Sequence, residues 1–108
     1  MFARHGVLPE ERTVGQVFVV DLAVETDTSV AGRSDDLADT VDYTALASQV
    51  ARRVQGERWD LLERVAQRVA EAALSFDGVD GVEVTVRKPD APLGVEFDDV
   101  AVTITRRR

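Results

Sequence analysis

Lys88 is the residue of this chain whose type and position best suit proton transfer. It is the single lysine among thirteen basic residues, of which the other twelve are arginine. An arginine stays protonated at any workable pH, whereas a lysine can release and regain a proton when its surroundings favour the neutral amine. Lys88 follows Val82, Val84 and Val86 on the apolar face of a predicted strand, which Pro89 ends. A partly desolvated amine there fits an acid–base catalyst; the alternatives are a surface lysine extending from a strand end, or chance in an arginine-rich chain.

The carboxylate of Glu63 has two interpretations. The sequence Asp60-Leu61-Leu62-Glu63 resembles a capping box with Asp in place of Ser or Thr, in which Glu63 returns to the backbone N–H of Asp60. Alternatively, the carboxylate points outward and accepts paired hydrogen bonds from a flat N–H/N–H edge, the pattern of guanidine-like heterocycles. The sequence favours the capping interpretation and leaves the binding interpretation open.

Glu11 and His5 could also take part in chemistry, although the sequence supports a plainer role for each. Glu11 lies in a polar segment, where an exposed loop carboxylate is the ordinary case. His5 is the only histidine and the chain has no cysteine, so a catalytic metal ion would lack ligands and we expect His5 to be structural. The sequence also contains no nucleophile elbow, GxGxxG or Walker motif, so we expect no metal and no bound cofactor.

Apolar residues that alternate with polar ones predict four strands. These strands cover part of residues 1–7, then 16–27, 82–88 and 100–104. On the longest strand, Phe18, Val20, Leu22 and Val24 share one face. The opposite face is also partly apolar and the edge strands lack an evident cap, which predicts oligomerisation through the sheet. That opposite face carries Val17, Val19 and Ala23.

Apolar spacings of three and four predict two amphipathic helices between the strand pairs. The first begins after an N-cap at Asp42 and ends at Gly56, and the second begins at Asp60; residues 29–40 read as a loop. The first apolar stripe is Tyr43, Leu46, Ala47, Val50, Ala51 and Val54, and the second is Leu62, Val65, Ala66, Val69, Ala72, Ala73 and Phe76. The order strand, strand, helix, helix, strand, strand predicts an α+β fold with both helices on one face of an antiparallel sheet.

Length, charge and composition limit the number of domains and the classes of protein to which this chain could belong. The chain has 108 residues, which suits one domain over residues 1–108. Twenty acidic residues against thirteen basic ones give a net charge of −7, which disfavours a nucleic-acid binder. No apolar run approaches the ~18 residues of a membrane span. The absence of cysteine and of a leader-like start is compatible with a reducing, cytoplasmic setting.

With these elements in order, the chain resembles the dihydroneopterin aldolase family of the tunnelling-fold (T-fold) superfamily over essentially its whole length. Five motifs in the family's order and spacing carry the resemblance. They are His5-Gly6-Val7 with Glu11 four before Gly15-Gln16, the acidic stretch 34–43 that ends in Val41-Asp42-Tyr43, Leu61-Leu62-Glu63, Lys88-Pro89 with Pro92, and Phe97-Asp98-Asp99-Val100-Ala101-Val102.

The resemblance implies an aldolase that needs neither a metal nor a Schiff-base lysine. The N5=C6 bond of 7,8-dihydroneopterin would act as the electron sink, and the products would be 6-hydroxymethyl-7,8-dihydropterin and glycolaldehyde, with epimerisation at C2′ as a side activity. By resemblance Lys88 transfers the proton, Glu11 orients it and Tyr43 assists protonation of the enol intermediate. Glu63 would bind the amino-pyrimidine edge of the pterin, aided by backbone groups near Val41 and Leu62.

Family members form tetrameric rings, often stacked as octamers, whose sheets close into a barrel with pockets between subunits. The resemblance therefore implies a homo-oligomer that binds a small pterin and neither nucleic acid nor membrane. The family usually begins with more residues of a first strand, so we expect that strand to be shortened here. Two alternatives stay open: a dihydroneopterin triphosphate epimerase, which needs a cationic site for three phosphates, and a non-catalytic pterin-binding T-fold assembly.

Overall fold

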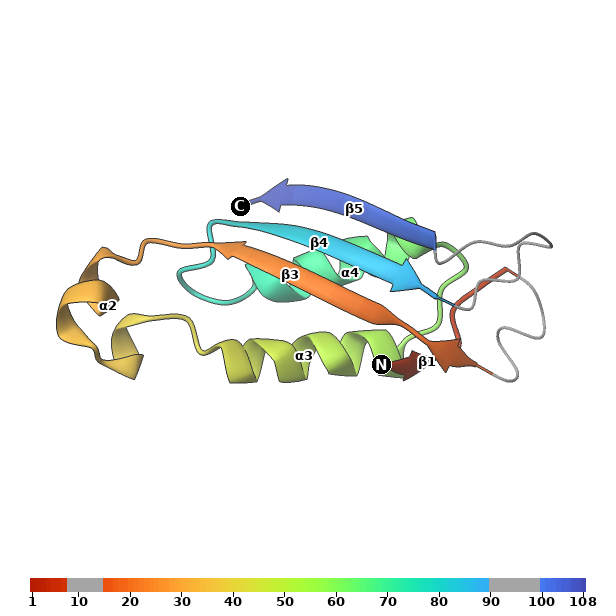
Figure 1. The fold of residues 1–108 in the computed structure, drawn as a ribbon, viewed down its shortest axis with the longest axis horizontal. Helices are drawn as coiled ribbons and strands as arrows, with labels where there is room; N and C mark the ends of the chain where they lie inside the picture. The colour runs from red at the N-terminus through yellow and green to blue at the C-terminus, as the bar shows by residue number, and fades with distance from the viewer. Residues whose placement is uncertain (8–14, 90–99) are drawn as a thin grey trace.

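In a computed structural model of the chain, residues 1–7, 15–89 and 100–108 are described. Most of the described residues lie in strands and in two long helices (Figure 1). In chain order the elements are β1 (Phe2–Ala3), β2 (Gln16–Val17), β3 (Val19–Glu25), α2 (Ser29–Ser34), the 3-10 helix η1 (Leu37–Asp39), α3 (Tyr43–Gly56), α4 (Leu62–Leu74), β4 (Gly81–Lys88) and β5 (Val100–Arg107).

The main sheet is antiparallel, in the order β3-β4-β5. Val20 pairs with Val86 and Val86 with Val102, so apolar residues of all three strands share one face. Helix α4 lies against one side of the sheet and α3 lies next to it, along the β3 edge (Figure 1). The buried residues of both helices join those of the strands in one core. This arrangement confirms the predicted α+β fold.

The predicted strand over residues 16–27 is interrupted at Phe18. Gln16 and Val17 form β2, which pairs with β1, and Val19 begins β3, which pairs with β4. At the interruption the backbone of Phe18 exchanges hydrogen bonds with Met1, and its side chain is fully buried. The single long strand was therefore wrong, because its two halves pair with different partners, although the predicted inward face was right.

Helix α3 begins as predicted. The side chain of Asp42 accepts hydrogen bonds from the backbone N–H groups of Thr44 and Ala45, both at 3.1 Å. Its buried residues, Leu46, Val50 and Val54, follow a spacing of four. The predicted stripe was too wide, since Tyr43 and Ala47 are exposed.

The predicted loop over residues 29–40 was wrong, because this segment contains α2 and η1. The side chain of Asp27 accepts a hydrogen bond from Ser29 N–H and that of Asp36 from Ala38 N–H. Neither helix has a buried residue. Short helices held by local hydrogen bonds carry no apolar stripe, so periodicity could not reveal them.

The sheet face opposite the helices is open and partly apolar, as predicted. In the main sheet this face carries Val19, which is 40% exposed, and Ala23, which is exposed as well. On the same face the hydroxyl groups of Thr85 and Thr103 are 2.8 Å apart. Val17 is 48% exposed but belongs to β2 of the two-stranded sheet.

Candidate active site

Lys88 is the last residue of β4, as predicted, and it is half-buried. Its Nζ lies 6.0 Å from the ring centroid of Phe18, at the outer limit of a cation–π contact. Because Phe18 is fully buried, the amine lies at the margin of the core.

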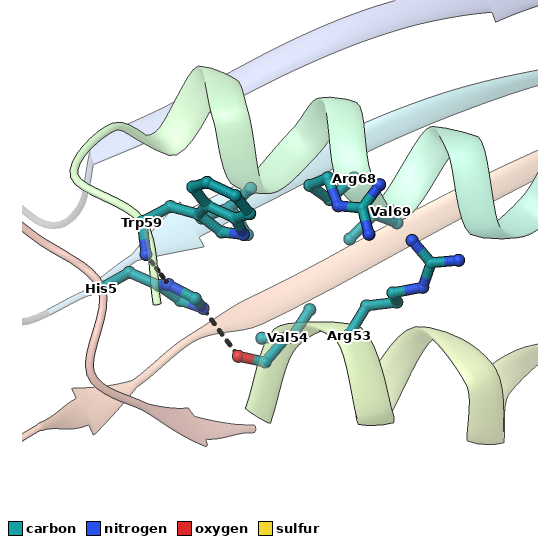
Figure 2. A pocket seen from close by; sticks show the side chains of 7 residues that line it. His5, Arg53, Val54, Trp59, Arg68 and Val69 are labelled. Carbon is teal, nitrogen blue, oxygen red and sulfur yellow. Dashed lines mark hydrogen bonds between the residues drawn. The ribbon is translucent and has the colours of Figure 1, made fainter. Parts of the chain in front are cut away.

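His5 packs next to Phe18 and contacts both α3 and the segment before α4. The His5 ring is 5.3 Å from the Phe18 ring, in an edge-on orientation of 75°. Its Nδ1 is 2.9 Å from Trp59 N and its Nε2 is 2.6 Å from Val54 O (Figure 2). The surrounding side chains leave no room for a water-sized molecule. The prediction that His5 is structural fits these contacts.

Burial lowers the pKa of His5 below its ordinary value of 6.5. The backbone carbonyl of Val54 and the charge of Glu57 raise this pKa, and the charge of Lys88 lowers it further. The net direction of the pKa shift is downward, so burial favours the neutral form of the ring.

Helix α4 begins one residue later than a capping box requires. Its N-cap is Leu61, whose carbonyl accepts from the N–H groups of Arg64 and Val65 and whose side chain makes no cap. Glu63 is therefore the second residue of the helix, and the predicted return to Asp60 is absent from the described contacts. The capping interpretation was wrong.

Instead, the Glu63 side chain is exposed in the first turn of α4. A carboxylate at this position interacts favourably with the helix dipole. Neither a hydrogen bond nor an ion pair joins it to another residue within 1–7, 15–89 or 100–108. Leu62, just before it, is half-buried against the core.

The segment before α4 is held by a charged network that sequence reasoning missed. The guanidinium of Arg68 donates two hydrogen bonds of 2.9 Å to the carboxylate of Glu57, which also accepts from Trp59 Nε1. These bonds, chiefly those from Arg68, lower the pKa of Glu57 to about 2. The Arg64 guanidinium lies over the Trp59 ring, 4.6 Å from its centroid. Glu57 and Arg68 are 11 residues apart, which is not a local helical spacing, so pattern analysis had no signal for the pair.

A surface hollow of about 510 Å³ lies beside this segment. It adjoins the first turn of α4, where Leu62 and Glu63 lie. The lining residues are Val7, Arg58, Trp59, Asp60, Leu61 and Arg64.

Tyr43 is the first residue of α3, and Val41 comes two residues before it. The start of α3 lies near the end of α4, away from the first turn of α4 that carries Glu63 (Figure 1). A Cβ added to Gly78, in the turn after α4, would be 3.7 Å from Val41 Cγ2. Helix α4, which has 13 residues and is about 20 Å long, separates that turn from the first helical turn that carries Glu63. Tyr43 is 79% exposed in the first turn of α3, and Val54, in the last turns of this helix, contacts His5. One copy of the chain therefore does not bring Tyr43 to Lys88.

A second hollow, of about 400 Å³, marks this opposite end. It includes Val41 and is rich in carboxylates, in contrast to the hollow beside α4. Its lining residues are Thr26, Asp27, Ala38, Asp39, Thr40, Val41, Asp77, Gly78 and Asp80.

Glu11 lies outside the described residues, as do Pro92 and the segment 97–99 of the family motifs. Within the described ranges, no three His, Asp or Glu side chains are grouped so that they could hold a metal ion. In the same ranges, none of the helices has the length and apolar character needed to cross a membrane.

Comparison with known proteins decides the family. The family model for dihydroneopterin aldolase (FolB) matches residues 1–105. The chain belongs to the dihydroneopterin aldolase family. Its activity is that family's aldehyde-lyase reaction in folate biosynthesis. The match to the family model confirms the resemblance that the sequence motifs indicate.

Individual relatives agree over nearly the whole chain. A dihydroneopterin aldolase of Streptomyces coelicolor is 51% identical over 104 residues, which cover 96% of this chain and 87% of that protein. That of Bacillus subtilis is 41% identical over 108 residues, or 99% of this chain and 90% of the relative.

Solved structures show the same fold. The structure of E. coli dihydroneopterin aldolase in complex with neopterin has a TM-score of 0.88 at 36% identity and covers 97% of this chain and 90% of its own. That of the Burkholderia thailendensis enzyme, bound to guanine, has a TM-score of 0.81 at 25% identity, covering 100% of this chain and 84% of its own.

Proposed function

We propose that the chain cleaves the side chain of 7,8-dihydroneopterin by a retro-aldol reaction that uses no metal and no Schiff base. The C2′ hydroxyl loses its proton, the C1′–C2′ bond breaks to release glycolaldehyde, and the electron pair passes into the N5=C6 bond, whose nitrogen takes up a proton. The enol intermediate then gains a proton on C1′ and loses the one on nitrogen, which gives 6-hydroxymethyl-7,8-dihydropterin. Recombination before release would epimerise C2′.

The position of Lys88 carries this proposal. An amine at the end of β4, half-buried beside Phe18, is partly removed from water while one side stays accessible. In that setting a lysine can act as both acid and base. We assign the proton transfers to Lys88, with Glu11 orienting it and Tyr43 assisting protonation of the enol.

Glu63 is the proposed anchor for the pterin. Its side chain is exposed in the first turn of α4, and the sequence neighbours Leu61 and Arg64 line the 510 Å³ hollow. Glu63 makes no hydrogen bond or ion pair with the other described residues. A carboxylate in this state can accept two parallel hydrogen bonds from the amino group and ring N–H of a pterin. Neopterin and guanine, seen in the two related structures, share this amino-pyrimidine edge. Backbone groups of Leu62 and Val41 would complete the contact.

We further propose that each pocket forms between two copies of the chain. Lys88 and Glu63 lie at one end of the long helices, whereas Tyr43 and Val41 lie at the other, so a complete set requires a neighbour. The open face of the main sheet with exposed Val19, together with exposed Val17 on β2, gives copies a surface on which to associate. A tetramer or an octamer satisfies this requirement. A single domain over residues 1–108 and a cytoplasmic location stay predictions.

Glycolaldehyde release from 7,8-dihydroneopterin tests the proposal. We expect Lys88→Ala and Lys88→Arg both to lower kcat at least about 100-fold, the usual contribution of a positioned acid–base group, because an arginine cannot release its proton. Arg52→Ala, which removes an exposed cation from α3, is the matched control and should keep wild-type turnover. Full turnover by Lys88→Arg would show that Lys88 transfers no proton.

A further inference from the structure

His5 is the only polar residue with a buried side chain in the described part of the chain, at 2% exposure. Both of its ring nitrogens have protein partners. The backbone N–H of Trp59 can only donate, so Nδ1 is the acceptor; the carbonyl of Val54 can only accept, so Nε2 carries the proton. The contacts therefore select one neutral tautomer of the imidazole.

This ring and the residue after it hold the segment that leads into α4. Trp59 N–H donates to His5 Nδ1, and Gly6 N–H donates to the carbonyl of Trp59, both at 2.9 Å. Both backbone groups of Trp59 are thus bonded to the His5–Gly6 pair. Trp59 lies two residues before the N-cap Leu61 and four before Glu63, so it belongs to the short segment that leads directly into the first turn of α4.

The other contacts of His5 lead to Lys88. The ring packs edge-on against Phe18 at 5.3 Å, and Lys88 Nζ lies 6.0 Å from the same Phe18 ring. The bond from Nε2 to Val54 fixes the ring against the last turns of α3. His5 therefore contacts Phe18, which lies beside the Lys88 amine, and Trp59, which precedes the helix turn that carries the Glu63 carboxylate.

We propose that His5 is a positioning residue, which holds the first turn of α4, and with it Glu63, at a set distance from Lys88. This inference rests on the roles proposed for Glu63 and Lys88. His5 touches no reacting atom. It acts through the hydrogen bond from the backbone N–H of Trp59 to His5 Nδ1. Loss of this hydrogen bond weakens the binding of the pterin ring by Glu63.

Two substitutions of His5 each remove one of its two hydrogen bonds, with Trp59 or with Val54, and can keep the other. In His5→Asn the amide oxygen can take the place of Nδ1 and accept from Trp59 N–H, while the donor to Val54 is lost. In His5→Gln the amide nitrogen can take the place of Nε2 and donate to Val54, while Trp59 N–H is left unpaired. Both variants lose the ring contact with Phe18 equally, so each is the control for the other.

The measurements are KM and kcat for glycolaldehyde release in the assembled enzyme, together with hydrogen exchange of the Trp59 amide. We expect His5→Gln to raise KM about tenfold and to speed exchange, because a buried N–H has lost its acceptor. His5→Asn should keep KM and exchange close to wild type. A KM that is equal in both variants, whether raised or not, would overturn the proposal.

Glu63→Gln in the same assay separates the proposal from the function on which it rests. If Glu63→Gln leaves KM unchanged while His5→Gln raises it, the anchoring role of Glu63 is wrong and the positioning of this segment by His5 stands. If neither substitution raises KM, both are wrong.

The wild-type protein offers a test that no folding defect can obscure. His5 is the only histidine, so its side-chain ¹⁵N resonances need no further assignment. We expect a neutral ring at pH 7 with the proton on Nε2. A protonated ring, or a proton on Nδ1, would exclude the hydrogen bond from Trp59 and overturn the proposal.

Discussion

Arg68 donates two parallel hydrogen bonds to the carboxylate of Glu57, from one face of α4 to the segment that precedes this helix. Both side chains are 25% exposed, so water screens the pair only partly. Glu57 also accepts a hydrogen bond from the indole of Trp59. The pair and the hydrogen bond of His5 therefore hold the same short segment from two sides.

The contribution of the Glu57–Arg68 pair to the free energy of unfolding should depend on pH. The pKa of Glu57 is about 2 in the folded chain against an ordinary value of 4.5, so the unfolded chain takes up the proton first as the pH falls. The network's contribution is therefore complete above pH 4.5 and is lost between pH 4.5 and 2. We expect Glu57→Gln to lower the free energy of unfolding by about 1–2 kcal/mol at pH 7, measured by urea denaturation, and to flatten its fall below pH 4.5.

Glu71→Gln is the matched control for this substitution. Glu71 also pairs with Arg68, but through a single contact and with a side chain that is 39% exposed. We expect a smaller effect on unfolding. An equal loss in both variants would show that the paired geometry at Glu57 adds nothing.

His5 should give a separate acid response, at higher pH. Burial lowers its pKa in the folded chain below 6.5, so the unfolded chain binds the proton more tightly. The free energy of unfolding should be unaffected by His5 above pH 6.5 and should fall as the pH drops below it. Thermal melts from pH 7.5 to 5 should show a declining Tm in the wild type and a flatter profile in His5→Asn. Parallel profiles would mean that the ring is protonated equally in both states.

Glu63→Gln should affect binding more than chemistry. The substitution keeps the size of the side chain but replaces one acceptor oxygen with a donor, which opposes the N–H edge of the pterin. We expect KM to rise about 10- to 100-fold, the value of a charge-assisted pair, with kcat changed much less. Tm should stay near wild type because Glu63 has no hydrogen-bond or ion-pair partner among the residues the structure describes. An unchanged KM would remove Glu63 from the site.

A mixing experiment tests whether the pocket is shared. Tyr43→Ala and Lys88→Ala should each be nearly inactive alone. If each pocket takes Tyr43 from one copy and Lys88 from the next, random assembly of equal amounts restores about a quarter of the pockets. Glycolaldehyde release should therefore recover after subunits are exchanged under mild denaturant and refolded together. Absence of recovery in an assembly shown to be mixed would place both residues in one copy.

Much of this fold follows from local patterns in the sequence. Alternating apolar residues predict that Phe18 and Val84 face inward, and a spacing of four predicts the buried line of Leu46, Val50 and Val54. The Asp42 cap needs only neighbours two and three residues away. These features depend on contacts within a few residues, so the sequence is sufficient for them. The family motifs likewise identify Lys88 and Glu63 as candidates.

Other features arise only when distant segments meet. The hydrogen bond between His5 and Trp59 joins residues 54 positions apart, and no periodicity records it. Helix α4 begins at Leu62 after the N-cap Leu61, which leaves Glu63 without a capping role, and the segment before it is bonded to residues far away in the sequence. The separation of Tyr43 from Lys88 is set by the lengths of two packed helices. Side-chain chemistry and spacing determined which residues could react, whereas tertiary packing decided which of them lie together, because long-range contacts and not local pattern set the distances.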